Sequence, residues 1–300
     1  MRDDRPIGAA GRITGTVCAA VTALLAVEIG RRVPALTGPA WVRRNYRGQA
    51  VNLVGGPAAA GTASVAAAFL PAGSGRSAAL LGLAAGAVGL YDDIVGARPE
   101  QVRGKGVTGH LRALRAGRVS TGAVKVLGIV GASLVAAGPV STGPLDRVVA
   151  AGVMAGTANL INLFDLRPGR AAKASALGAT VLLGGGTGGV GAAVLGTSLG
   201  ILPADLGEKV MLGDAGANAL GALLGYRLAA GSSRPARAGI LAGLVALTAA
   251  SEKVSFTRVI EATPGLREFD RWGRLPVERE GASTGRGRQP APPLSSPPMS

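Results

Sequence analysis

Apolar stretches separated by short basic segments occupy most of this 300-residue chain. Each stretch is near the length of a membrane-spanning helix, and so many of them cannot be hidden in one water-soluble core. Only 16% of the residues are charged, against about a quarter in an ordinary soluble domain. The pattern predicts an all-α, polytopic membrane protein. The stretches cover residues 13–27, 53–70, 78–91, 119–138, 148–164, 174–204, 210–230 and 238–250.

The stretch 174–204 is long enough for two short helices, and a glycine-rich segment, Gly184–Gly189, interrupts it. Glycine clusters punctuate helices, so we expect two helices here and about nine transmembrane helices in all. Most Lys and Arg residues then fall on one side of the membrane, which the positive-inside rule places in the cytoplasm. Residues 1–275 form the predicted membrane domain. The Pro-, Ser- and Arg-rich tail, 276–300, is predicted to be disordered.

The net charge of +15 is compatible with nucleic-acid binding in principle. The basic residues, however, lie between apolar stretches rather than on one amphipathic face. We interpret them as topology signals and as contacts to anionic membrane lipid, and we expect no nucleic-acid partner. Cys18 and His110 are the only residues of their types, so neither a disulfide framework nor a Cys/His metal site is possible.

Four carboxylates stand at the edges of apolar stretches. Asp92 and Asp93 close the third stretch, Asp165 closes the fifth, and Asp214 lies near the start of the seventh, which is the eighth of the nine predicted spans. A charged side chain at mid-bilayer costs roughly 2.5–3.5 kcal/mol, so carboxylates near lipid need a compensating role. With nine spans, all four lie at the cytoplasmic boundary and can converge. The alternative is helix capping, for which Asp214 directly after Gly213 is well placed.

Oxygen ligands gathered at a membrane surface suit Mg²⁺, which binds a few carboxylates together with substrate phosphates. With basic side chains nearby, the expected chemistry is phosphoryl transfer, in which a metal and cationic groups neutralise developing charge. The residues alone therefore favour a Mg²⁺-dependent enzyme with a cytoplasmic-face active site.

Three segments resemble, in order, motifs of the polyprenyl-phosphate N-acetylhexosamine-1-phosphate transferases, also called glycosyltransferase family 4. This family includes phospho-N-acetylmuramoyl-pentapeptide transferase. Tyr91–Gly96 is similar to its DDxxG motif, Asn159–Asp165 to its NxxNxxD motif, and Met211–Asn218 to its MGDxGS motif. The resemblance covers about residues 10–275.

The resemblance implies Mg²⁺-dependent transfer of a sugar-1-phosphate from a UDP-sugar to polyprenyl phosphate, with release of UMP. It implies a multi-pass protein of the plasma membrane that acts in cell-wall biogenesis, and a homodimer is compatible with it. It also implies residue roles. The catalytic residues would be Asp92, Asp93 and Asp214, the Mg²⁺ ligands Asp214 and Asp93, and the substrate-binding residues Asn159, Asn162 and Asp165.

The sequence departs from the family pattern in two places. Pro168 replaces the second Asp expected after the middle motif, and the segment 251–273 lacks the family's histidines. Basic side chains are expected to contact the substrate phosphates instead, since Arg matches phosphate well. The candidates are Lys105, Lys125, Arg167, Arg170, Lys253 and Arg258, and the segment Asn45–Gln49 is a candidate for the lipid acceptor's path.

Two other functions stay open at this stage. A non-catalytic family descendant would bind polyprenyl phosphate or regulate envelope assembly, as the two departures suggest. A transporter would use its carboxylates to carry ions, but it would place them near the centres of the spans rather than at their ends.

Overall fold

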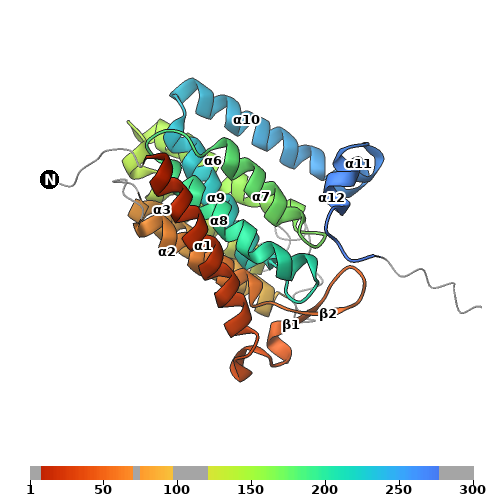
Figure 1. Cartoon of the computed structure of the whole chain (residues 1–300). Coiled ribbons are helices and arrows are strands. Elements are labelled where there is room, and N and C mark those ends of the chain that lie inside the picture. Colours follow the sequence, from red (N-terminus) through yellow and green to blue (C-terminus); the bar gives the residue numbers. More distant parts are fainter. Residues whose placement is uncertain (1–7, 70–74, 97–120, 277–300) are drawn as a thin grey trace, which may run out of the picture.

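The computed structural model describes residues 8–69, 75–96 and 121–276, which form a helical bundle with one small β-hairpin (Figure 1). The longer helices are α1 (Ala9–Gly30), α2 (Gly55–Phe69), α3 (Gly75–Val95), α5 (Thr121–Ala136), α6 (Pro144–Phe164), α7 (Arg170–Val181), α8 (Gly188–Leu206), α9 (Gly213–Gly231) and α10 (Arg234–Ser251). Two short helices follow, α11 (Phe256–Ala262) and α12 (Leu266–Arg271). The hairpin pairs β1 (Val42–Arg44) with β2 (Ala50–Asn52), antiparallel.

The all-α prediction is confirmed, and each of the other predicted apolar stretches corresponds to one helix. The stretch 174–204 is divided as expected, because α7 ends at Val181 and α8 begins at Gly188. Gly185 has a φ of +74°, a left-handed conformation that glycine adopts readily. Contacts between helix ends indicate that the nine longer helices alternate in direction. The ends of α1, α3, α6, α8 and α10 therefore lie together with the starts of α2, α5, α7 and α9.

Helix α9 forms the centre of the bundle and is buried along almost its whole length. It packs against α6, α3 and α2, and glycines allow the closest approaches. A Cβ atom on Gly225 would lie 2.6 Å from the Met154 Cα atom of α6, and one on Gly221 would lie 2.7 Å from the Ala158 Cα atom. Small residues at such positions are typical of helices that pack closely in membranes.

The helices are consistent with a membrane protein, although the predicted nine transmembrane helices are not confirmed. Within the described residues, α1, α3, α6 and α8 are long and apolar enough to cross a membrane. The pair α10 and α11, bent by 90°, would provide a fifth span, while α5 is apolar but short. Helices α2 and α7 have only 15 and 12 residues. Because its neighbours enclose α9, it can carry charged residues without meeting lipid.

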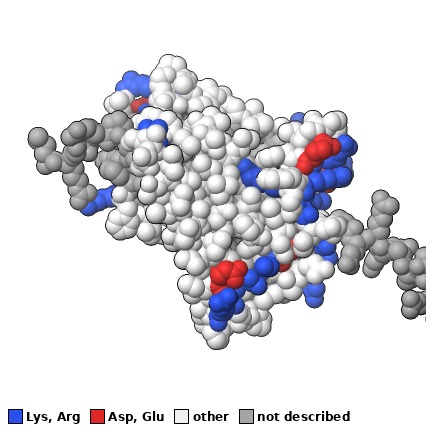
Figure 2. Space-filling view, in the orientation of Figure 1, with Lys and Arg blue, Asp and Glu red and all other residues white. Residues whose placement is uncertain are grey.

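Charged side chains gather toward the ends of the bundle. Figure 2 shows a broad uncharged band across the middle of the visible face, with Lys, Arg, Asp and Glu at its margins. Near the end of α1, Arg31 pairs with Glu28 at 3.2 Å. This distribution agrees with a lipid-facing belt between two polar ends.

The β-hairpin and the helices α11 and α12 were not expected from the apolar pattern. The hairpin lies in the segment after α1, where only an irregular basic loop was predicted. Its edge continues into the segment before α9 through a parallel bridge between Asn52 and Val210. The predicted tail, apart from its first residue Pro276, lies outside the described residues.

Candidate functional site

The acidic end of α3 is held directly against the start of α9. Gly89 makes this possible, since a Cβ atom there would lie 2.6 Å from the backbone carbon of Asp214. The Asp93 carboxylate then accepts hydrogen bonds from the backbone N–H groups of Asp214 at 3.1 Å and Ala215 at 3.0 Å. These N–H groups have no partner within their own helix, and the helix dipole favours a negative charge near them. Asp93 thus caps α9 from another helix.

Asp165, which follows α6, also contacts the start of α9. It lies just beyond the end of α6, and its carboxylate accepts a hydrogen bond from the backbone N–H of Gly213. Burial raises the pKa of Asp165 well above the usual value for a carboxyl group, and the carboxylates of Asp205 and Asp214 add to this effect. A buried carboxyl group close to other carboxylates is stabilised in its neutral form, or by a nearby cation.

Asp214 does not occupy the N-cap position of α9, so its alternative interpretation as a helix cap is wrong. Asp214 lies within the first turn of α9, and no side-chain hydrogen bond caps this helix from its N-cap position, Leu212. Instead, its carboxylate pairs with the ammonium group of Lys125, from α5. The same Lys125 Nζ atom lies 2.8 Å from Asp92 Oδ2. One ammonium group therefore bridges two carboxylates that come from different helices.

We call Asp92, Lys125 and Asp214 the charged triad. Its side chains are between 17% and 26% exposed, so they are largely shielded from solvent but remain reachable. The carboxylates of Asp92 and Asp214 point toward one position, which the ammonium group fills. The predicted convergence of the four aspartates at one end of the bundle is thus present in the structure.

An open cleft of about 680 Å³ lies beside this cluster, and Asp165 belongs to both. The β-hairpin forms one wall with Arg44, Asn45 and Tyr46, and α11 forms another. The segment before α9 contributes Val210 and Met211. The other lining residues are Val51, Leu166, Arg167, Pro168, Asp205, Glu208, Ser255, Thr257, Arg258 and Glu261.

Two of the predicted phosphate partners face this cleft. The guanidinium of Arg167 lies 4.3 Å from the centre of the Tyr46 ring and 3.8 Å from Glu261, so it connects the hairpin to α11. Arg258 is exposed on α11 and also lines the cleft. The hairpin segment proposed for the acceptor's path therefore lies opposite two basic side chains.

The other basic candidates lie elsewhere. Arg170 is buried, and its guanidinium pairs with Asp270 at 2.7 Å and donates to Thr257 at 2.9 Å, so it supports the fold rather than facing the cleft. Lys253 is exposed and does not line the cleft. Lys105 and His110 lie outside the described residues.

The two asparagines of the middle motif do not line the cleft. Asn159 donates from Nδ2 to Thr248 Oγ1 of α10 at 3.2 Å. Asn162 Oδ1 is buried and has no hydrogen-bond partner in the described part of the chain. Asp165 does not continue the helical face of these asparagines, because α6 ends at Phe164 and Asp165 leaves the helix. An unpaired buried oxygen one turn before the cleft is a potential contact for a polar ligand.

Asp205 was missed by the sequence analysis. Only 2% of this residue is exposed, and its carboxylate accepts a hydrogen bond from the Gly169 backbone N–H at 3.0 Å. It closes the apolar stretch 174–204, so the rule that selected the other aspartates would have found it. Glu208 was also missed; it accepts hydrogen bonds from Asn45 at 2.6 Å and Arg47 at 3.0 Å and so fixes the hairpin.

Whether the site suits Mg²⁺ depends on which side chains could coordinate it. Among the described residues, no three or more His, Cys, Asp or Glu side chains are arranged to hold a metal ion by themselves. Mg²⁺ commonly needs only one or two carboxylates, because water and substrate phosphates complete its coordination. Asp92 and Asp214, which already share one cationic partner, fit this requirement. Asp93 fits less well, since both its oxygens accept backbone hydrogen bonds.

Comparison with known protein families finds no match to the chain, and comparison with curated protein sequences finds none either.

Proposed function

We propose that this chain is a membrane transferase that moves a sugar-1-phosphate from a UDP-sugar to polyprenyl phosphate at the charged triad. The observation that carries the proposal is the bridge from Lys125 to Asp92 and Asp214 beside a cleft whose lining includes both arginine and carboxylate side chains. The motif resemblance supplies the substrate classes, with N-acetylhexosamine as the expected sugar. The site would lie at the cytoplasmic face of the plasma membrane, where a soluble nucleotide-sugar meets a lipid acceptor.

In the proposed reaction, an oxygen of the lipid phosphate attacks the β-phosphorus of the UDP-sugar. A new P–O bond forms, the bond between the two phosphates of the donor breaks, and UMP leaves. The ammonium group of Lys125 would release one of its two carboxylates and pair with the phosphate oxygens, whose developing negative charge it would stabilise. Asp92 would accept a proton from a protonated lipid phosphate. Bound Mg²⁺, held by Asp214 and Asp92, would supply further neutralisation of the transferred phosphate.

The cleft is the proposed site of the nucleotide. Arg258 and Arg167 are suited to pair with its phosphates, because guanidinium groups bind phosphate through paired hydrogen bonds. Asp165 and the unpaired oxygen of Asn162 would contact polar groups of the donor.

Arg167→Ala and Arg258→Ala should each weaken binding of the UDP-sugar, measured by isothermal titration. Normal affinity in both variants would remove these two residues from the donor site.

A non-catalytic lipid-phosphate binder is the second candidate. It is favoured by the triad itself, in which the ammonium group of Lys125 pairs with both carboxylates and balances part of their charge. Such a protein would bind polyprenyl phosphate but would not consume a nucleotide-sugar.

One assay distinguishes the two candidates. Membranes that contain the protein are given radiolabelled UDP-sugars and polyprenyl phosphate, with and without Mg²⁺, and the label that extracts with lipid is counted. The transferase produces Mg²⁺-dependent labelled lipid from at least one donor. Absence of product from every UDP-N-acetylhexosamine tested, in membranes that still bind polyprenyl phosphate, would favour the binder.

A further inference from the structure

The chain changes direction sharply after α10. Helices α10 and α11 meet at an angle of 90°, and α12 follows α11 after a short turn (Figure 1). The rings of Phe164 in α6 and Phe256 in α11 lie 5.6 Å apart, which holds α11 to the bundle. A helix that crosses a membrane and then bends by a right angle continues along the membrane surface.

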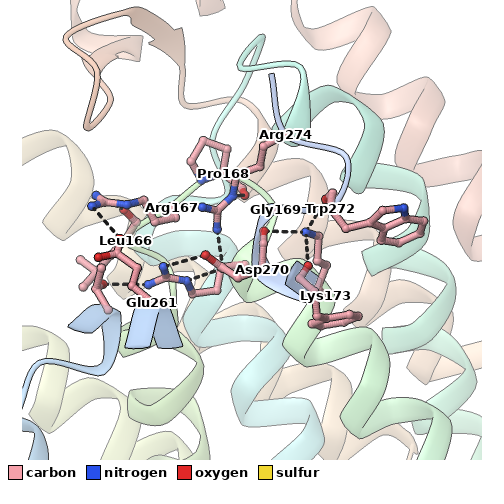
Figure 3. A network of polar contacts seen from close by, with 12 residues as sticks. Leu166, Arg167, Pro168, Gly169, Lys173, Glu261, Asp270, Trp272 and Arg274 are labelled. Carbon is pink, nitrogen blue, oxygen red and sulfur yellow. Dashed lines mark hydrogen bonds and ion pairs between the residues drawn. The ribbon is translucent and has the colours of Figure 1, made fainter. Parts of the chain in front are cut away.

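The inner side of α12 is charged. Asp270 is only 6% exposed and pairs with the guanidinium of Arg170 at 2.7 Å. Lys173 donates to the backbone oxygens of Phe269 at 3.0 Å, Asp270 at 2.9 Å and Trp272 at 2.6 Å (Figure 3). We call these contacts the α12 clamp. They fix which side of α12 faces the bundle.

The exposed surface of the segment Leu266–Leu275 has an apolar flank and a charged flank, and the charged flank carries Glu268 and Arg271. Leu266 is 50% exposed, Phe269 45%, Trp272 67% and Leu275 45%. A surface helix in water shows the reverse arrangement, with its apolar face turned toward the protein. The rings of Phe269 and Trp272 lie 5.6 Å and 5.9 Å from Lys173 Nζ, yet both side chains remain about half exposed or more, so the apolar flank is not covered by the bundle. Lipid is the environment that would accept it.

We propose that Leu266–Leu275 is an interfacial membrane anchor, whose apolar side chains insert among the headgroups of a lipid bilayer. Trp is enriched at this depth, because its ring has both an apolar body and a polar N–H group. The charged flank of the segment carries Arg267 and Arg271 with one exposed carboxylate, Glu268, and its arginines would face anionic headgroups. The anchor would hold α11, one wall of the cleft, at the bilayer surface.

Trp272 itself provides the test, because Trp41 is the only other tryptophan. The full chain with Trp41→Phe is reconstituted into vesicles of phosphatidylcholine and phosphatidylglycerol that carry bromine at defined depths. We expect a blue-shifted Trp272 emission that is quenched most strongly by bromine near the headgroups and little by aqueous iodide. If Trp41→Phe does not fold, a chain with Cys18→Ser and Trp272→Cys gives the same measurement through a fluorescent label on the introduced thiol.

The control variant is Leu266→Ser combined with Leu275→Ser, two exposed side chains that make none of the contacts of the α12 clamp. It should weaken quenching by brominated lipid and increase quenching by iodide. Trp272 that is quenched freely by iodide in the parent chain would overturn the anchor. So would shielding from both quenchers, which would mean that protein, such as a second copy of the chain, covers this face. Neither result depends on transferase activity.

Discussion

Lys125 carries the positive charge that the two carboxylates of the triad share. Lys125→Met should lower the stability of the protein by about 3 kcal/mol, because it leaves two shielded carboxylates without a cation. If Asp92 and Asp214 can hold Mg²⁺, millimolar Mg²⁺ should then raise the melting temperature of the variant in detergent more than that of the wild type. The ammonium group would no longer compete for the same position.

The exposed Lys209 provides the matched control. Lys209→Met should change neither the stability nor the response to Mg²⁺. A Lys125→Met variant whose melting temperature ignores Mg²⁺ would argue against a metal between these carboxylates.

Asp270 predicts how stability depends on pH. Burial alone would raise its pKa, but the hydrogen bonds and charges of Arg170 and Arg274 outweigh burial and hold the pKa below its usual value. A carboxyl group with a lowered pKa stabilises the fold above its unfolded pKa of about 3.9, and this contribution is lost as the pH falls through the folded pKa. Asp270→Asn should therefore melt at a lower temperature than wild type at pH 7, and the difference should narrow as the pH falls below about 4. A constant difference would contradict the assignment.

At the level of elements, the approach of α3 to α9 determines whether the aspartates meet. Gly89→Ala adds a Cβ atom that would lie 2.7 Å from the Cα atom of Ala215, so the helices must separate. Overpacking of this kind costs about 1–3 kcal/mol and should move Asp93 away from the start of α9. Gly131→Ala in α5 is the control, because no atom lies within 4 Å of its added Cβ. Thermal unfolding of the two variants in detergent should separate them, and equal melting temperatures would refute the close contact.

The helices were predictable because apolar stretches and glycine breaks are local features of the sequence. The break between α7 and α8 follows directly from the glycines between them. The capping of α9 by Asp93 and Asp165 was not predictable, because it depends on three helix ends that are distant in sequence. The hairpin and α12 were missed for a related reason. Their stability comes from contacts such as those of Glu208 and Lys173, not from an apolar pattern.

For the whole molecule, alternating helix directions predict that the two ends of the bundle face different compartments. Leu145, at the start of α6, is 78% exposed at one end, and Lys253, after α10, is exposed at the other. In a Cys18→Ser background, Leu145→Cys should react with an impermeant maleimide from outside intact cells. Lys253→Cys should react only after the cells are opened. Labelling of both positions from the same side would exclude the proposed topology.

The convergence of Asp92 and Asp214 was expected, since all four aspartates were predicted at one end, but their pairing with Lys125 was not, because that lysine was predicted to contact substrate phosphate. The division of the four aspartates into two groups was not expected either: Asp93 and Asp165 stabilise the start of α9, whereas Asp92 and Asp214 remain available around one cationic position. The proposed chemistry is therefore assigned to Asp92 and Asp214 rather than to Asp93 and Asp165.

The most direct measurement is UMP release by the purified protein in the presence of polyprenyl phosphate, Mg²⁺ and the best UDP-sugar donor. Asp214→Asn should lower the rate by at least about 100-fold, as expected when a group that stabilises transition-state charge is lost. Glu28→Gln, which alters a partly exposed ion pair of α1, should leave the rate unchanged. Wild-type rates in Asp214→Asn, or no UMP release by the wild type with any donor, would contradict the proposed transferase.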